Sequence, residues 1–244
     1  MINEFLRVLA AALAIVALIF AIMSIVRGQW SVADVHMFQF PGPERTPDTT
    51  VDFGLYAYKA YLFGAKDAEW HLYTKIQQTD NVKYLEMAGE AVCFAMVGCE
   101  TCLSLYILYG LLRAFYYGWT MWTARLIQDD SWSTLVEDCI LIGLNFLACT
   151  TAILAVCFWG VAGHNASQKI QAALTSLPVP AVAAEASYGL SFTYAIIATL
   201  SSFLCCVLQI FIYLRNSTKR EHGFAGGLIP NYDTFGSSSA PMPL

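Results

Sequence analysis

FLRVLAAALAIVALIFAIMSIV, residues 5–26, is an apolar run long enough to cross a membrane. Three further runs share this character: Ala88–Leu112, Cys139–Val161 and Leu190–Leu214. About 20 mostly apolar residues in a helix span a hydrocarbon core of roughly 30 Å, and only helices or closed barrels hide their backbone polar groups in lipid. The runs lack the alternation of barrel strands. They therefore predict an all-α membrane protein with four spans.

Composition agrees with this fold class. The chain has 244 residues, of which 57% are hydrophobic and only 13% are charged, against about 25% charged residues in an ordinary soluble domain. The formal charge of -5 argues against nucleic-acid binding. All 8 cysteines lie inside the apolar runs, so the connecting loops hold no disulfide. Cys99 and Cys102 have the C-x-x-C spacing of metal or redox sites, but they lie in the middle of an apolar run with no second pair and no nearby His. We find no nucleophile triad or phosphate-binding loop, and we expect no enzymatic activity and no cofactor.

The runs divide the chain into spans and loops, and the placement of basic residues orients it. Arg113, Arg125, Arg215, Lys219 and Arg220 cluster on one side, which the positive-inside rule assigns to the cytoplasm. Both termini are then cytoplasmic, and we expect the plasma membrane. The expected segments are 1–27 (N-terminus and first span), 28–87 (extracellular, β-rich), 88–112 (second span), 113–138 (cytoplasmic loop), 139–161 (third span), 162–189 (second extracellular loop), 190–214 (fourth span) and 215–244 (disordered cytoplasmic tail).

The loop 28–87 is too long and too apolar for a linker. Strand-like pieces occur at Val32–Phe38, Val51–Phe63 and Trp70–Ile76, and the last of them alternates apolar and polar residues. They predict a small extracellular antiparallel sheet on the outer end of the helices. In the second outer loop, Gln168–Leu174 is expected to be helical, and Asn165 begins an Asn-x-Ser glycosylation motif.

Small residues recur along each span at steps of three and four. Such rows let helix backbones approach closely in lipid, where burial of apolar surface does not drive association. The mean step is near the 3.5-residue repeat of left-handed packing, so we expect a left-handed four-helix bundle with Asn145 and Gln209 facing inward. The expected packing positions are Ala14, Ala17, Ala95, Gly98, Ala148, Ala152, Ala198 and Ser202.

Two short motifs in the first outer loop bear on family. Trp30 follows the first span, and Gly54-Leu55-Tyr56 follows later in the loop. Together they resemble the Trp and Gly-Leu-Trp signature of the claudin-like tetraspan superfamily, which includes claudins and the channel-associated gamma (TARP) subunits. The resemblance implies cytoplasmic termini, a large first outer loop and a left-handed bundle. The chain departs from the family in lacking the two loop cysteines and in having Tyr56 in place of the last Trp.

Candidate sites point to protein contacts. Glu100 lies in the middle of the second span, where a carboxylate costs about 2.5–3.5 kcal/mol on insertion scales. It is expected to contact a partner's span or form an ion or proton site, or else to hydrogen-bond, protonated, within its own bundle. Other candidate partner-binding residues are Trp30, Gly54, Leu55, Tyr56 and Trp70. The scattered His36, His71 and His164 do not form a metal site.

The sequence therefore predicts a non-enzymatic auxiliary or assembly subunit of a larger membrane protein, a channel or a receptor. A claudin-like junctional or self-assembling adhesion protein is the alternative, and a small transporter or channel is a second alternative. Expected partners are membrane lipid and a larger membrane protein or a second copy of the chain. The tail motifs Tyr232–Phe235 and Met242–Leu244 offer contacts for a cytoplasmic adaptor.

Overall fold

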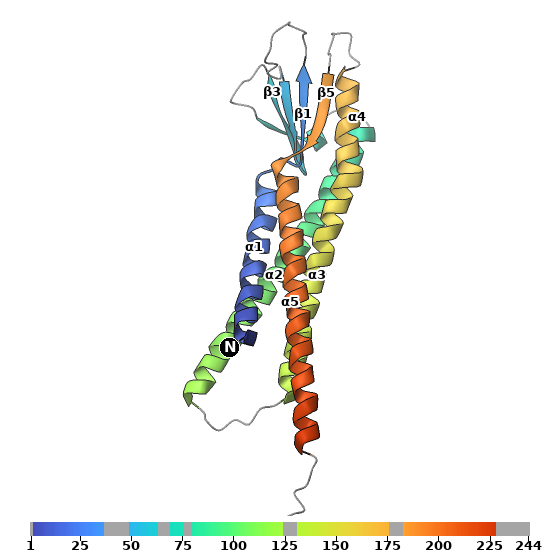
Figure 1. The fold of residues 1–244 in the computed structure, drawn as a ribbon. Coiled ribbons are helices and arrows are strands. Elements are labelled where there is room, and N and C mark those ends of the chain that lie inside the picture. Colours follow the sequence, from blue (N-terminus) through green and yellow to red (C-terminus); the bar gives the residue numbers. More distant parts are fainter. Residues whose placement is uncertain are drawn as a thin grey trace, which may run out of the picture.

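The computed structural model describes residues 2–36, 49–62, 69–75, 80–123, 131–175 and 183–227. Among these, 4 helices are long and apolar enough to cross a membrane. These helices are α1 (Ile2–Val26), α2 (Asp80–Thr123), α3 (Ser131–Phe158) with its continuation, and α5 (Leu190–Gly227). A small antiparallel sheet sits at one end of the helices, and α1 begins and α5 ends toward the other end (Figure 1). The predicted helical fold with a small sheet is confirmed.

The helices extend beyond the apolar runs. The second span was predicted to begin at Ala88, but α2 begins at Asp80, and it ends at Thr123 instead of Leu112. α3 continues through a π-helical turn, η2 (Trp159–Gly163), into α4 (His164–Thr175). α5 ends at Gly227, so the first part of the predicted disordered tail is helical. Hydropathy marks only the part of a helix that lies in lipid, and these polar ends carry no apolar signal. The tail motifs at 232–235 and 242–244 lie outside the described residues.

The long helices pack as a ring in which α1 contacts α2 and α5, and α3 contacts α2 and α5. Three of the predicted small-residue rows face the interior. Fully buried members of these rows are Ala14, Ala17, Ala148, Ala152, Ala198 and Ser202. Asn145 and Gln209 also point inward, and the hydroxyl of Tyr106 donates to Gln209 Oε1 at 3.4 Å.

On α2 the predicted positions lie at the margin of the interface: Ala95 packs against the core, and a Cβ on Gly98 would lie 3.5 Å from Thr151 of α3. Ala95 and Gly98 are only half-buried, and the fully buried row consists of Val92, Met96, Cys99 and Leu103. Alanine rows on the other helices leave space that medium-sized side chains must fill, because protein interiors are close-packed. The periodicity of small residues could not show which helix supplies those larger side chains.

Charged residues join three helices at the end away from the sheet. Arg113 of α2 makes ion pairs with Glu137 and Asp138 of α3, each at 3.2 Å. Asn216 of α5 donates to the other oxygen of Asp138 at 3.5 Å. Because buried carboxylates are stable only when paired, this group ties α2, α3 and α5 together.

The sheet contains a strand that the sequence did not predict. Its order is β4-β3-β2-β1-β5, all antiparallel. The first four strands are β1 (Ser31–His36), β2 (Thr49–Phe53), β3 (Ala57–Leu62) and β4 (Trp70–Leu72), the last followed by the 3₁₀ helix η1 (Tyr73–Lys75). The predicted strand Val51–Phe63 is thus two strands. β5 (Ala183–Tyr188) comes from the second loop and pairs with β1, so the sheet is not confined to the first loop.

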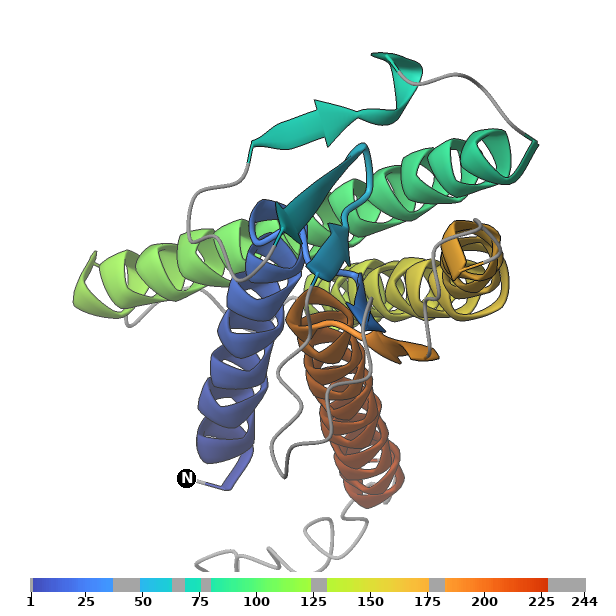
Figure 2. The same ribbon diagram turned by 90° about the horizontal axis from the view of Figure 1, so that it is seen from above.

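The two faces of the sheet differ. Ala33, Val51 and Phe53 are buried on the face toward the helices, where α4 packs along β1 and β5. The alternate residues of the same strands, among them Asp34 and Asp52, point to the opposite face. β4 and η1 lie at the α2 side of the molecule, as the view from above shows (Figure 2).

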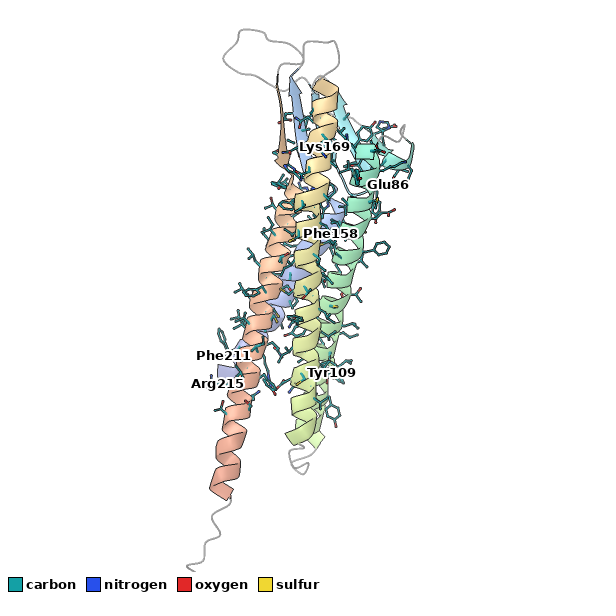
Figure 3. All side chains as sticks on the ribbon, turned by 90° about the vertical axis from the view of Figure 1, so that its right-hand side faces the viewer. Glu86, Tyr109, Phe158, Lys169, Phe211 and Arg215 are labelled. Atoms are coloured by element: carbon teal, nitrogen blue, oxygen red, sulfur yellow. The ribbon has the colours of Figure 1, made fainter. Side chains whose placement is uncertain are left out.

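Large apolar side chains cover the outside of the helices. Phe158 and Phe211, for example, are 47% and 52% exposed (Figure 3). Outward apolar residues on helices of this length are what a lipid surround requires.

Candidate functional site

Trp30 lies at the joint between sheet and bundle and is fully buried. Its indole packs against Trp159 at 5.4 Å and Phe192 at 6.3 Å between ring centroids. Trp159 Nε1 donates to the Trp30 carbonyl oxygen at 3.2 Å and to Ser31 Oγ at 3.1 Å. The position of Trp30 right after the first span therefore serves to fix β1 to η2 and α5.

Gly54 and Leu55 form a second part of this joint. Gly54 N–H donates to the Ala57 carbonyl at 2.8 Å, and the buried Tyr73 hydroxyl donates to the Gly54 carbonyl at 3.0 Å. Burial raises the pKa of Tyr73, so its hydroxyl remains a donor. Leu55 is 4% exposed and lies against Gly89 of α2 so closely that a Cβ at Gly89 would overlap the Leu55 carbonyl oxygen.

The motif residues thus divide into two groups. The structure buries Gly54 and the side chains of Trp30 and Leu55, so a partner cannot reach them in the folded protein. Tyr56 and Trp70 are accessible, at 46% and 45% exposed; Tyr56 directly precedes β3, and Trp70 begins β4. The Trp70 indole also lies over Gly28 and Gly54, where added Cβ atoms would contact it at 3.2 and 3.4 Å.

Glu100 lies at the edge of the buried row of α2. It is half-buried, next to the fully buried Cys99, and its Oε1 is shielded from solvent without a hydrogen-bond partner among the described residues. A shielded carboxyl oxygen in a span remains costly until a donor reaches it.

A chain of polar contacts crosses the joint. Ser31 Oγ lies 3.3 Å from His164 Nδ1, and Gln168 Nε2 lies 3.2 Å from His164 Nε2. The His164 ring stacks on Tyr188 with a centroid distance of 4.0 Å, and Tyr188 stacks on Phe192 at 4.3 Å. These contacts satisfy a buried histidine without a metal ion. Among the described residues, no group of three or more His, Cys, Asp or Glu side chains could hold one.

The predicted glycosylation motif falls on α4. Asn165 is exposed, and its side-chain amide donates to the Val161 carbonyl at 2.6 Å. Ser167, the third residue of the motif, is fully buried and donates to the His164 carbonyl. The helical setting and the buried hydroxyl argue against modification of Asn165 in the folded protein.

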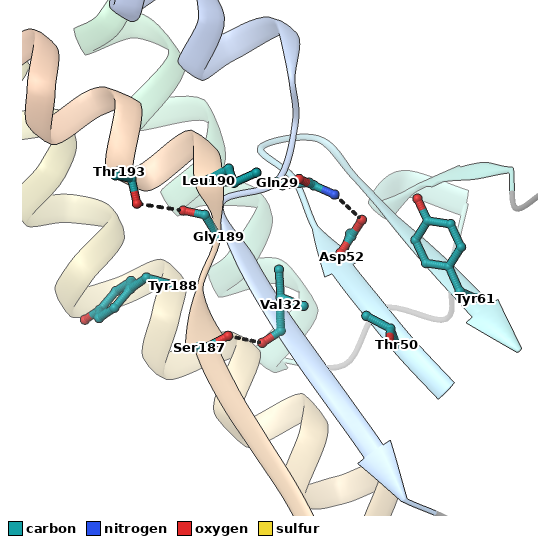
Figure 4. Close-up of a pocket in the computed structure, with 10 residues that line it drawn as sticks. All are labelled: Gln29, Val32, Thr50, Asp52, Tyr61, Ser187, Tyr188, Gly189, Leu190 and Thr193. Atoms are coloured by element: carbon teal, nitrogen blue, oxygen red, sulfur yellow. Dashed lines mark hydrogen bonds between the residues drawn. The ribbon is translucent and has the colours of Figure 1, made fainter. Parts of the chain in front are cut away.

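The sequence analysis did not single out the groove that the structure shows between the polar sheet face and the start of α5. It has a volume of about 560 Å³ and is open to solvent (Figure 4). Side chains from β1, β2, β3, β5 and α5 line it, and they include Asp52, Thr50, Tyr61, Ser187 and Thr193. The one available signal was the alternation of Thr50 and Asp52 with Val51 and Phe53, which marks a polar face on β2.

Asp52 lies at the base of the groove and is 3% exposed. Gln29 Nε2 donates to its Oδ2 at 2.8 Å. Burial raises the pKa of Asp52, and hydrogen bonds from Gln29 and Tyr61 and the nearby Lys59 oppose that rise. The groove therefore holds one shielded carboxyl group that is only partly compensated.

These features combine a buried joint, an exposed β4 strand with aromatic side chains nearby, and a polar groove at the level where α1 and α5 meet the sheet. No protein-family model matches the chain, and no curated protein matches it in a sequence comparison.

Proposed function

We propose that this protein is a non-enzymatic membrane protein that acts as an auxiliary or assembly subunit of a larger membrane protein, a channel or a receptor. The observation that carries the proposal is that β4 is an edge strand: within the described part of the chain it pairs with β3 alone. All three residues of β4 are exposed, whereas α4 packs along β5 at the opposite edge. A free edge strand offers unpaired backbone groups to another chain.

The side chains around this edge suit a protein partner. Tyr56, Trp70 and Leu72 are each 45–46% exposed. Aromatic residues are enriched in the energetic centres of protein interfaces. The joint at Trp30 and Leu55 holds this edge in a fixed position above α2, so an outer contact and a lateral contact along α2 can form together. Two linked contacts bind more tightly than either alone.

Glu100 extends this surface into the span in our proposal. Its shielded carboxyl oxygen lacks a donor within the described part of the chain, and a donor on a partner's helix would satisfy it. Replacing Glu100 with Leu should then lower recovery of the partner while leaving the bundle folded. Unchanged recovery would remove Glu100 from the interface.

Affinity purification in mild detergent followed by mass spectrometry tests the proposal. We expect a stoichiometric larger membrane protein with the unchanged chain and at least a roughly tenfold lower recovery with Leu72→Glu, since a charge in an apolar contact costs more than the 1.4 kcal/mol of a tenfold change. Lys169→Glu on the exposed face of α4 is the matched control (Figure 3). Recovery of no larger protein, or equal losses with both variants, would contradict the proposal.

A claudin-like junctional role is the second candidate. Its support is spatial: Trp30 and Gly54-Leu55, the residues that resemble the family signature, meet at one joint although they are separated in the sequence. In this version the sheet end faces the outside of the cell, the termini are cytoplasmic in the plasma membrane, and the bundle is left-handed. Expression in non-adherent cells should then bring cells together, and tags on the two termini should stay protected in sealed cells.

A further inference from the structure

The groove lies at the level where a membrane would end. α1 ends at Val26, β1 begins at Ser31, and α5 begins at Leu190. The lining residues Gln29, Gly189 and Leu190 come from these turning points, and the remaining ones come from the sheet (Figure 4). With the apolar helices in lipid, the groove therefore opens into the headgroup layer of the leaflet.

The charges near the groove have a fixed order along the molecule. Arg27 is exposed at the end of α1, and its guanidinium donates to the Tyr194 hydroxyl at 2.6 Å, beside the lining residue Thr193. Gln29 follows, and its amide reaches Asp52 on the sheet. From the span outward, the groups therefore lie in the order cation, neutral amide and carboxylate.

The sheet side of the groove is net acidic. Among the side chains described there, Asp52 and Asp34 lie on the polar face together with Lys59, whose Nζ lies 5.1 Å from the centroid of the Tyr61 ring. Thr50 Oγ1 donates to Asp34 at 3.0 Å. The Lys59 ammonium already occupies the Tyr61 ring, and the two carboxylates outnumber this cation, so the face attracts a further ammonium group and disfavours an anion.

Apolar side chains continue from the groove toward the span. Leu190 lines the groove and is 48% exposed. Met23 lies one turn before Arg27 on α1 and is 40% exposed. These residues offer an apolar path along α1 and α5 for acyl chains.

We propose that the groove binds a zwitterionic phospholipid, with its phosphate beside Arg27 and its ammonium group beside Asp52 and Tyr61. In such a lipid the phosphate lies between the acyl chains and the ammonium group, which is the order of the apolar path, the cation and the carboxylate in the protein. A lipid with an anionic headgroup would place its outer negative charge or hydroxyls against the carboxylates. This inference does not depend on the protein partner proposed above.

Native mass spectrometry in detergent tests this inference with an equimolar mixture of phosphatidylcholine, phosphatidylethanolamine and phosphatidylglycerol. The unchanged protein should retain the two zwitterionic lipids in preference to phosphatidylglycerol. Asp52→Asn should lower phosphatidylcholine retention about tenfold through loss of the carboxylate charge that attracts the ammonium group and should shift the preference toward phosphatidylglycerol. Arg27→Gln should lower retention of all three lipids.

Glu86→Gln is the matched control, because it removes a carboxylate from the same end of the molecule on α2 (Figure 3). Its lipid retention should equal that of the unchanged protein. If Asp52→Asn does not fold, Tyr61→Leu serves instead and should lower phosphatidylcholine retention. Equal retention of phosphatidylglycerol by the unchanged protein, or unchanged retention in the folded Asp52 or Tyr61 variant, would overturn the inference. Displacement of lipid by an equal concentration of glycerophosphocholine would show a site for a soluble ligand instead.

Discussion

The side chain of Asp52 is buried although it carries an ionisable group. The residue occupies a strand position whose neighbours Val51 and Phe53 are buried in the joint, so its own side chain must point to the polar face. There the Gln29 amide, 2.8 Å away, shields it from water. Burial raises the pKa of Asp52, and the surrounding donors only partly offset this. The ionised group is therefore less stable in the folded protein than in the unfolded chain.

The sign of the pH dependence follows from this shift. A carboxyl group whose folded pKa is raised favours folding below its ordinary pKa near 3.8 and loses that contribution as pH rises through the folded value. Asp52→Asn should therefore raise the unfolding midpoint at pH 7 in detergent without added phospholipid. The gain should shrink toward pH 4. Thermal unfolding at both pH values measures it, and a lower midpoint for the variant at pH 7 would contradict the assignment.

At the scale of elements, the π-helical turn η2 explains how α3 reaches the sheet. Trp159 begins the turn and Gly163 ends it. A Cβ on Gly163 would lie 2.5 Å from Cε3 of the Trp159 ring. The missing side chain allows the indole to lie across the turn and donate to Trp30 and Ser31. Extra residues in a helical turn often mark sites where a side chain needs a particular direction.

Gly163→Ala should therefore destabilise the protein by about 1–3 kcal/mol, as overpacking of a filled core does. Gly143→Ala is the matched control on α3, because no atom lies within 4 Å of an added Cβ there. The control should leave stability unchanged or raise it by up to about 1 kcal/mol. Unfolding midpoints and near-ultraviolet circular dichroism of the buried tryptophans measure both effects. Equal behaviour of the two variants would contradict the role of η2.

At the scale of the whole molecule, the main feature is that the sheet is attached to the helices at several points. Its base is fixed at α2 through Leu55, at η2 through Trp30 and at α5 through Gly189, where an added Cβ would overlap the Gln29 carbonyl oxygen. At the end away from the sheet, the ion pairs of Arg113 with Glu137 and Asp138 join α2 to α3. The protein is therefore held at both ends, and the proposed contacts at β4 have a fixed position relative to α2.

Gly89→Ala should separate the sheet from α2 while the helices stay folded, because its Cβ has no space beside Leu55. Hydrogen exchange should rise in the peptides that contain β2 and β3 and stay constant in α1 and α5. Gly110→Ala on the same helix meets no atom within 4 Å and is the control. If Gly89→Ala leaves exchange in the sheet unchanged, the joint at Leu55 does not hold the sheet.

The sequence by itself determined the helices, because lipid demands a long apolar run and any such run is visible without knowledge of its neighbours. It also determined the inward alanine rows of α1, α3 and α5, since small residues at helical spacing have few other uses. The strands of the first loop were visible in part through alternation. Only their ends and the division at Gly54 escaped the pattern.

The tertiary structure decided everything that depends on a neighbour. The residues Ala183–Tyr188 have little strand preference of their own, and pairing with β1 makes them a strand. The buried row of α2 is set by the alanines that it faces, and Glu100 lies at the edge of this row. The groove at Asp52 exists only because the ends of α1 and α5 meet the sheet there. Contacts between residues distant in the chain leave no local periodicity, and so no reading of one segment at a time reveals them.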